Sequence, residues 1–300
     1  MQIAGISIHS IAKIVDFLLH SLTIPRFFIS HFPIGKSCFS ELGINFMDRP
    51  SNPFVFTKKA VFMQRISDAV VNGAVGYIQG TISVAKAGFF AAKMQDRYEC
   101  HLGYQEASRK RKLGYATAKM YFWHPKTGDL NLHWILLITK GRLKNGVGSD
   151  ENWQDPINKT QRIRIENYCL VRLPSTFDTK PRWSWKYTRA SYDAIRNDIV
   201  NAIRSKNNER LKVIVYNLCR SPSFGGVREQ VKSLVELIKE EWRRIRGITE
   251  KMPELPKKLG YVRRLEDKGV RLHAIRVQLE KIEIFSQEHL EDMQRYYDDE

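Results

Sequence analysis

Hydrophobic and polar positions divide the chain into a helical part, a strand-rich part and a second helical part. Residues 57–101 are apolar at helical spacing and contain many small side chains, which predicts helices. Within them, residues 69–85 carry no charge. Small residues four apart allow close contact between helices, so this stretch favours a buried helix or a helix pair packed through glycines, with a transmembrane helix as the alternative.

Strand patterning begins near residue 113 and continues to residue 188. Residues 115–123 alternate in part, the segment PKTGD supplies a turn, and residues 132–139 are continuously apolar. This pattern predicts a β-hairpin with a buried second strand. Two more strands are expected at 162–173 and 182–188. The sequence therefore predicts an α+β fold with a central antiparallel sheet of about four strands.

Helical spacing returns over residues 189–247, with Thr188 as a candidate N-cap, and predicts a C-terminal helical bundle. Two of its helices flank the turn SPSFGG in a helix-turn-helix layout. That layout would expose Arg228, Gln230 and Lys232 at the start of the second helix. Alternatively, the amides of Gly225 and Gly226 would receive a phosphate there. Residues 57–250 thus form the expected core.

The two ends of the chain are expected to lie outside this core. Residues 1–56 form an apolar segment without the basic start and small-residue cleavage site of a signal peptide. Either this segment lies outside the core, or the true start is Met47 and residues 1–46 are not part of the native protein. A further alternative for the function is a membrane-associated accessory protein anchored through residues 3–34 or 69–85. Residues 251–300 comprise a Pro/Lys linker, a basic segment and an acidic tail.

Charge is the feature that most restricts the function. The chain has 49 Lys and Arg against 32 Asp and Glu, a formal net charge of +17. An excess of this size attracts polyanions, so the leading expectation is a partner nucleic acid, DNA or RNA, ahead of an anionic membrane. Four cysteines at wide spacings predict neither a disulfide framework nor a zinc ribbon. They indicate a reducing, cytoplasmic location, and no motif in the sequence predicts a cofactor or a metal.

Basic residues with aromatic neighbours are the candidates for contacting phosphates and bases. The segment RKRK at 109–112 is either a phosphate-binding loop at the base of the hairpin or a solvated turn. On the strand 182–188, Trp183, Trp185 and Tyr187 share one face, where they either stack on bases or belong to the core. The predicted nucleic-acid-binding residues are Arg109, Lys110, Arg111, Lys112, Arg182, Lys186, Arg189, Arg196, Arg228 and Lys232.

The sequence NLH at 131–133 resembles the strand motif of rolling-circle replication initiators and conjugative relaxases, in which two histidines flank one hydrophobic residue. The resemblance implies a metal ligand at His133 and a tyrosine nucleophile at Tyr192, with Arg196 one turn later. Here Asn131 replaces one histidine, so the alternative to simple binding is a degenerate nicking enzyme. A zinc site is also conceivable at Cys100, His101, His124 and His133, but the spacings of these residues match no established zinc-binding pattern.

Four other segments resemble uncharacterised proteins of bacterial plasmids and integrative conjugative elements. These segments are LHWILLITKG, RWSWKYT, FGGVREQV and LGYVRRLEDKG. The resemblance implies a role in the maintenance, transfer or regulation of such an element. Together with the charge, it favours a non-enzymatic DNA- or RNA-binding protein.

Overall fold

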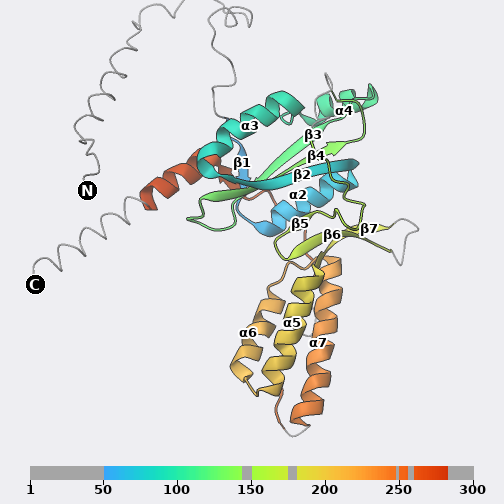
Figure 1. The fold of residues 1–300 in the computed structure, drawn as a ribbon, viewed down its shortest axis with the longest axis vertical. Coiled ribbons are helices and arrows are strands. Elements are labelled where there is room, and N and C mark those ends of the chain that lie inside the picture. Colours follow the sequence, from blue (N-terminus) through green and yellow to red (C-terminus); the bar gives the residue numbers. More distant parts are fainter. Residues whose placement is uncertain (1–50, 144–150, 175–180, 248–249, 256–259, 283–300) are drawn as a thin grey trace, which may run out of the picture. The chain divides into compact units, whose positions relative to one another are not determined.

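Two β-sheets and the helices packed on them make up the described part of the chain, in a computed structural model that covers residues 51–143, 151–174, 181–247, 250–255 and 260–282 (Figure 1). The α+β class is confirmed. The predicted N-terminal apolar segment lies outside the described residues up to position 50. In chain order the elements are β1 (Phe54–Phe56), α2 (Lys59–Val71), β2 (Ala74–Ser83), α3 (Val84–Tyr98), α4 (Tyr104–Lys112), β3 (Ala118–Trp123), β4 (Asn131–Thr139), β5 (Arg164–Ile165), β6 (Tyr168–Leu173), β7 (Arg182–Tyr187), α5 (Arg189–Arg204), α6 (Asn208–Cys219), α7 (Gly225–Arg246) and β8 (Gly269–Arg271).

The sheets differ from the single antiparallel sheet that the sequence predicts. One sheet has the strand order β2-β4-β3-β1-β8, and the other has the order β5-β6-β7. In the first sheet β1 pairs with β3 in parallel, whereas the other neighbours are antiparallel. The predicted hairpin is confirmed as β3 and β4, which pair from Ala118 with Ile138 to Trp123 with His133.

Strand β4 is apolar from Trp134 to Ile138 because helices cover both of its faces. Ile135 and Leu137 belong to the core cluster that includes α2. Leu132 packs with α3 and with the helix that begins at Leu272, and Leu136 packs with the end of α3. Figure 1 shows α3 and α2 on opposite sides of this sheet. Burial on both faces removes the usual alternation of polar and apolar residues.

The prediction of helices across 57–101 is wrong in its middle, where residues 74–83 form the long strand β2. Its glycines make room for side chains of β4 rather than for a helix. A Cβ on Gly80 would lie 3.2 Å from the indole of Trp134, and one on Gly76 would lie 3.0 Å from Ile138. Small residues and missing charges fit a buried strand as well as a buried helix, so the composition alone could not separate the two.

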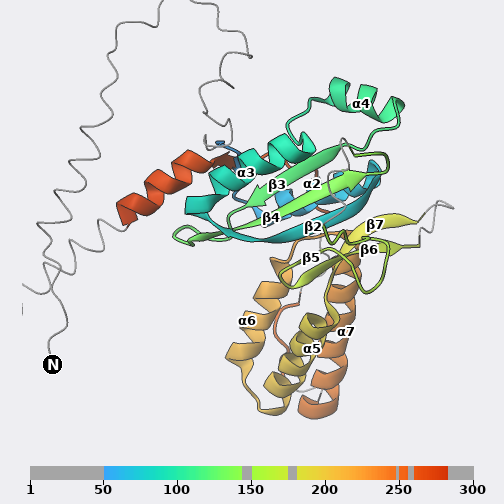
Figure 2. The same ribbon diagram turned by 45° about the horizontal axis from the view of Figure 1, so that its top comes forward.

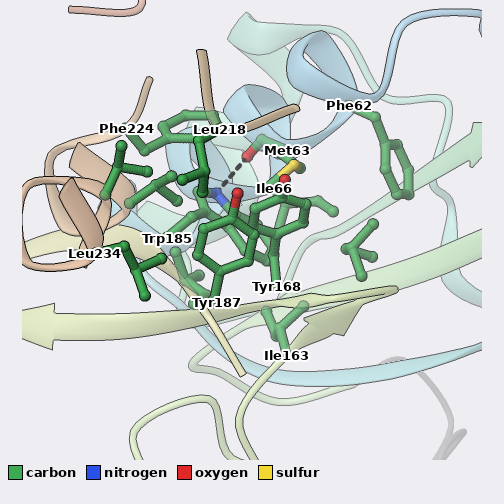
Figure 3. Packing of buried hydrophobic residues seen from close by; sticks show 14 of the residues in the cluster. Phe62, Met63, Ile66, Ile163, Tyr168, Trp185, Tyr187, Leu218, Phe224 and Leu234 are labelled. Atoms are coloured by element: carbon green, nitrogen blue, oxygen red, sulfur yellow. Dashed lines mark hydrogen bonds between the residues drawn. The ribbon is translucent and has the colours of Figure 1, made fainter. Parts of the chain in front are cut away.

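Helix α2 lies between the two sheets. From the three-stranded sheet, Trp185 donates its indole N–H to the main-chain carbonyl of Met63 at 3.1 Å and to Ser67 Oγ at 2.8 Å (Figure 3). Trp185 is fully buried and Tyr187 is 7% exposed. The aromatic face of β7 is therefore core, as one of the two readings of the sequence predicts for these residues. The helices α5, α6 and α7 extend this core through residues such as Leu218 and Leu234.

Residues 260–282 pack on the core, which differs from the separate C-terminal region predicted for 251–300. The Gln64 amide donates to the carbonyl of Arg263 at 2.7 Å and its oxygen accepts from the Leu265 N–H at 3.0 Å. Strand β8 then pairs with β1, and the helix after it covers α3. A strand of three residues has no readable period, so its partner could not be inferred from the sequence.

Candidate nucleic-acid interface

The ten predicted nucleic-acid-binding residues lie on two separate surfaces. Arg109, Lys110, Arg111 and Lys112 belong to α4, at one end of the five-stranded sheet. The other six lie on β7, α5 and α7, and α4 is distant from these elements in both views (Figures 1 and 2). The sequence prediction therefore describes two surfaces, and their charge environments differ.

Carboxylates balance the basic residues of the β7–α7 surface. Arg182 and Lys186 both lie 3.9 Å from the carboxylate of Glu229. Arg189 forms an ion pair with Asp193 at 3.6 Å. Acidic side chains also line the neighbouring groove, as described below. This surface is thus a mixed one, in which carboxylates lie beside the predicted cations and weaken the attraction for a polyanion.

The start of α7 is covered by other parts of the chain. The Gly226 N–H donates to Ser184 Oγ at 3.0 Å, and the Gln230 amide oxygen accepts from the Tyr187 N–H at 2.7 Å. The guanidinium of Arg228 lies 3.5 Å from the ring centroid of Tyr261. These contacts correct the prediction of an exposed recognition helix at Arg228 and Gln230, whereas Lys232 is exposed. They also correct the prediction of a phosphate site, because Ser184 of β7 accepts the Gly226 N–H.

The structure does not bring His133 and Tyr192 together. The His133 ring is stacked on Trp123 with centroids 5.0 Å apart, on strand β4. Tyr192 is half-buried on α5, which lies apart from β4 in Figure 1. Tyr192, Arg196 and Lys232 line a shallow groove between α5 and α7 together with Glu229, Glu236 and Glu240. The arrangement required for metal-dependent nicking is therefore not assembled by these residues.

Two of the residues considered for a zinc site, Cys100 and His124, form hydrogen bonds with main-chain carbonyls instead. The Cys100 thiol donates to the carbonyl of Met94 at 3.4 Å, and burial raises its pKa to about 12. Zinc binds the thiolate, which is scarce at neutral pH for such a group. His124 is buried, and its Nε2 lies 2.7 Å from the carbonyl of Asp129. Within the described ranges, no group of three or more His, Cys, Asp or Glu side chains is placed to hold a metal ion.

Helix α4 carries an unbalanced set of cations. Arg109, Arg111 and Lys112 are exposed, whereas Lys110 is half-buried and forms an ion pair with Glu99. Glu106 is the one acidic residue in the sequence of this helix. The segment RKRK is thus the last turn of a helix before the hairpin rather than a loop. Cations at a helix C-terminus are favourable because they face the negative end of the helix dipole.

The chain after α4 is held beside the end of β4. The Ala116 N–H donates to the carbonyl of Arg142, and the Arg142 N–H donates to the carbonyl of Gly114, both at 2.9 Å. Gly141 has φ +145° and a Cβ there would lie 2.4 Å from the Ala116 nitrogen, so this approach requires glycine. The Arg142 guanidinium consequently lies 5.5 Å from the ring centroid of Tyr115.

A cleft of about 310 Å³ opens between the end of α3, α4 and this paired segment. Apolar lining comes from Leu113, Ala116 and Leu143, with the Tyr115 ring beside them, and Arg97, Lys110 and Arg142 supply positive charge. Glu99 also lines the cleft and has φ 51° at the C-cap of α3. A left-handed residue commonly ends a helix in this way, although glycine is the usual residue there.

A second cleft of about 180 Å³ lies against α4 and the end of the hairpin. Tyr104, Arg111, Thr117 and Lys119 are among its lining residues. Tyr104 is 82% exposed and Tyr115 is 39% exposed. Exposed rings beside exposed cations therefore occur in both clefts that border α4.

Sequence reasoning identified the cations of α4 but missed Tyr104, Tyr115, Lys119, Arg97 and Arg142. Tyr115 is three positions after RKRK, which is a signal that could have included it. Arg142 follows β4 in the segment TKGR, where the glycine marks a close approach. Their proximity comes from pairing between distant segments and is not readable from spacing.

Comparisons with protein-family models, with curated proteins and with solved structures found no match to this chain. No described helix is long and apolar enough to span a bilayer. The chemistry of the described side chains is therefore the basis for a functional assignment.

Proposed function

We propose that this protein binds nucleic acid, DNA or RNA, without catalysing a reaction on it. The binding site in this proposal is the α4 surface, which comprises the helix cations and the rings and cations of the two adjoining clefts. The residues of the α4 surface are Arg109, Lys110, Arg111, Lys112, Tyr104, Tyr115, Lys119 and Arg142.

The observation that carries the proposal is the exposure of three cations in the last turn of α4 beside two exposed tyrosines. Arg109, Arg111 and Lys112 are exposed, and so are Tyr104 and Tyr115. Guanidinium and ammonium groups neutralise phosphates, while aromatic rings stack on bases without regard to sequence. The net charge of +17 adds a long-range attraction for a polyanion.

Two triple variants test which surface binds. The first is Arg109→Gln with Arg111→Gln and Lys112→Gln, on α4. The second is Arg182→Gln with Arg196→Gln and Lys232→Gln, which removes the same charge from the β7–α7 surface. Fluorescence anisotropy with labelled oligo-thymidylate and oligo-uridylate, over a range of salt concentrations, measures the affinity of each full-length protein.

The α4 variant is expected to bind more weakly and with a smaller salt dependence. For single strands the slope of log affinity against log salt changes by about 0.7 per phosphate contact, so three lost contacts reduce it by about 2. The β7–α7 variant should retain most of the wild-type slope. Equal losses of affinity in the two variants would show that binding depends only on net charge. That result would contradict the assignment of the binding site to the α4 surface. Failure of the wild-type protein to bind either oligonucleotide, or a duplex of DNA or RNA, at low salt would overturn the function itself.

The proposal includes a cytoplasmic location. Cys100, Cys169 and Cys219 are free thiols in the structure, which is typical of proteins in reducing compartments. A role in a mobile genetic element, which the sequence resemblance implies, stays a prediction.

A further inference from the structure

We infer that the cleft beside Tyr115 receives one unpaired base of a nucleic-acid strand, so that the ligand is single-stranded rather than duplex. This inference rests on the proposed function and names the form of nucleic acid that the α4 surface binds.

The dimensions and lining of the cleft suit the flat face of a base. Its volume of about 310 Å³ is at the lower end of the range for small-molecule pockets. Leu113, Ala116 and Leu143 give it an apolar lining beside the Tyr115 ring. A base within a duplex is stacked on both faces and cannot enter such a cleft without being extruded, which costs free energy. An unpaired base enters without that cost.

Tyr115 is held in position before any ligand binds. Its N–H donates to the carbonyl of Lys110 at 3.0 Å, and its backbone pairs with Arg142. The guanidinium of Arg142 also contacts its ring. A backbone that is fixed in advance loses little conformational entropy when the ring stacks on a base, which favours binding.

The charges around the cleft fit a strand rather than a free nucleotide. Arg142 and the ion pair of Lys110 with Glu99 lie at the cleft, while Arg109, Arg111 and Lys112 are exposed on the same helical turn. A single nucleotide carries its phosphates at one point, whereas a strand presents several phosphates at different points. The cluster of exposed cations beside one base-sized cleft therefore favours a polynucleotide with one base inserted.

Duplex binding is the competing arrangement, in which α4 enters a groove and the cleft stays empty. It predicts that affinity depends on the phosphates and the groove and not on Tyr115. The two arrangements therefore differ in how they respond to removal of bases and to removal of one ring.

The test compares three probes with equal numbers of phosphates, using the full-length protein. They are oligo-thymidylate, the same strand built from abasic units, and a self-complementary duplex. Oligo-thymidylate is expected to bind at least about fivefold more tightly than the abasic strand, because one stacked base contributes about this much. It should also bind more tightly than the duplex per phosphate.

Tyr115→Ala is expected to abolish the preference for oligo-thymidylate over the abasic strand, whereas Tyr115→Phe retains it. Tyr216→Ala is the matched control, since Tyr216 is also exposed and also has a guanidinium over its ring, that of Arg220, but it lies on α6 outside the α4 surface. Equal loss in both alanine variants would overturn the assignment to the Tyr115 cleft. Equal wild-type affinity for oligo-thymidylate and the abasic strand, with the α4 triple variant still weakened, would overturn the inference and leave nucleic-acid binding standing. No binding to any probe would overturn both. Parallel measurements with oligo-uridylate and an abasic RNA strand show whether the same cleft serves RNA.

Discussion

The indole N–H of Trp185 reaches the main-chain carbonyl of Met63, 122 positions away in the chain, and both residues are fully buried. This hydrogen bond joins the three-stranded sheet to α2, which itself covers the five-stranded sheet (Figure 3). The two sheets therefore share one core, and the helices α5 to α7 are continuous with it.

Replacing this indole should weaken the whole core. Trp185→Phe removes the N–H that Met63 and Ser67 accept and leaves part of the indole volume empty, so the free energy of unfolding should fall by about 2 kcal/mol. Trp183→Phe is the matched control, because Trp183 is half-buried and lies beside Arg172. Its cost should be below about 1 kcal/mol. Urea unfolding followed by circular dichroism compares the two, and equal losses would contradict the special role of Trp185.

Two adjacent glycines at the start of α7 should respond in opposite ways. A Cβ on Gly226 would lie 2.6 Å from the carbonyl oxygen of Trp185, which is backbone and cannot move cheaply. Gly226→Ala should therefore destabilise the protein by about 1–3 kcal/mol. A Cβ on Gly225 would meet Ser184 Oγ at an ordinary 3.6 Å. Gly225→Ala should be neutral or stabilising by up to about 1 kcal/mol, because alanine is the better helix former. Thermal unfolding of the two variants measures the difference, and similar shifts in Tm would contradict it.

Arg246 closes the end of the helical bundle. Its side chain is 3% exposed, contacts the Trp242 ring and donates to the carbonyl of Ile203, to Asn208 Oδ1 and to the Glu250 carboxylate. Arg246→Met keeps the apolar stem but leaves these acceptors without their donor.

The expected loss of unfolding free energy for Arg246→Met is about 2 kcal/mol, since hydrogen bonds from a charged group contribute about 1.5–3 kcal/mol. Arg244→Met provides the control in the same helical turn. The Arg244 side chain is 57% exposed and pairs with Glu241, so its loss should cost below about 0.5 kcal/mol. A cost for Arg244→Met as large as that for Arg246→Met in urea unfolding would show that charge at the helix end, rather than burial, is responsible.

Cys100 should resist alkylation. Burial raises the pKa of its thiol from 9.0 to about 12, so at neutral pH it holds about a thousandfold less thiolate than an unperturbed thiol. Because the folded pKa is raised, the reaction rate should keep increasing with pH until about 12. Cys219 is exposed and should react first. Peptide mass spectrometry after timed iodoacetamide treatment measures both sites. Equal native rates would contradict the burial of Cys100, and equal rates in urea serve as the control.

Local patterning predicted the parts of the fold that depend on local contacts. Residues 132–139, the hairpin with 118–123 and the three helices α5 to α7 all formed where periodicity placed them. The strand β2 was mistaken for helix because its glycines face Trp134 and Ile138, which are far away in sequence. The three-residue strands β1 and β8 depend on each other and carry no period of their own.

The candidate site, like the fold, could be predicted from the sequence only where it depends on local features. The run RKRK is conspicuous in the sequence, and its exposure on α4 follows from its polarity. In contrast, the basic residues Arg182 and Lys186 looked equivalent until folding placed Glu229 beside both. Tyr115 and Arg142 became neighbours through the close approach at Gly141. Charge can be counted from a sequence, but its neutralisation depends on contacts between distant residues.

The pairing of β8 with β1 also determines when the five-stranded sheet can be completed during translation. Thr57 donates its N–H to the carbonyl of Lys268, a residue 211 positions later. During translation, β1 leaves the ribosome long before β8 has been synthesised. The apolar layer of Val55, Phe122 and Leu132 therefore stays uncovered until Leu272 and Ile275 are present. The five-stranded sheet is therefore completed only after β8 and the helix that follows it have been synthesised. Nascent or prematurely terminated chains that lack these residues would expose that layer to chaperones and proteases.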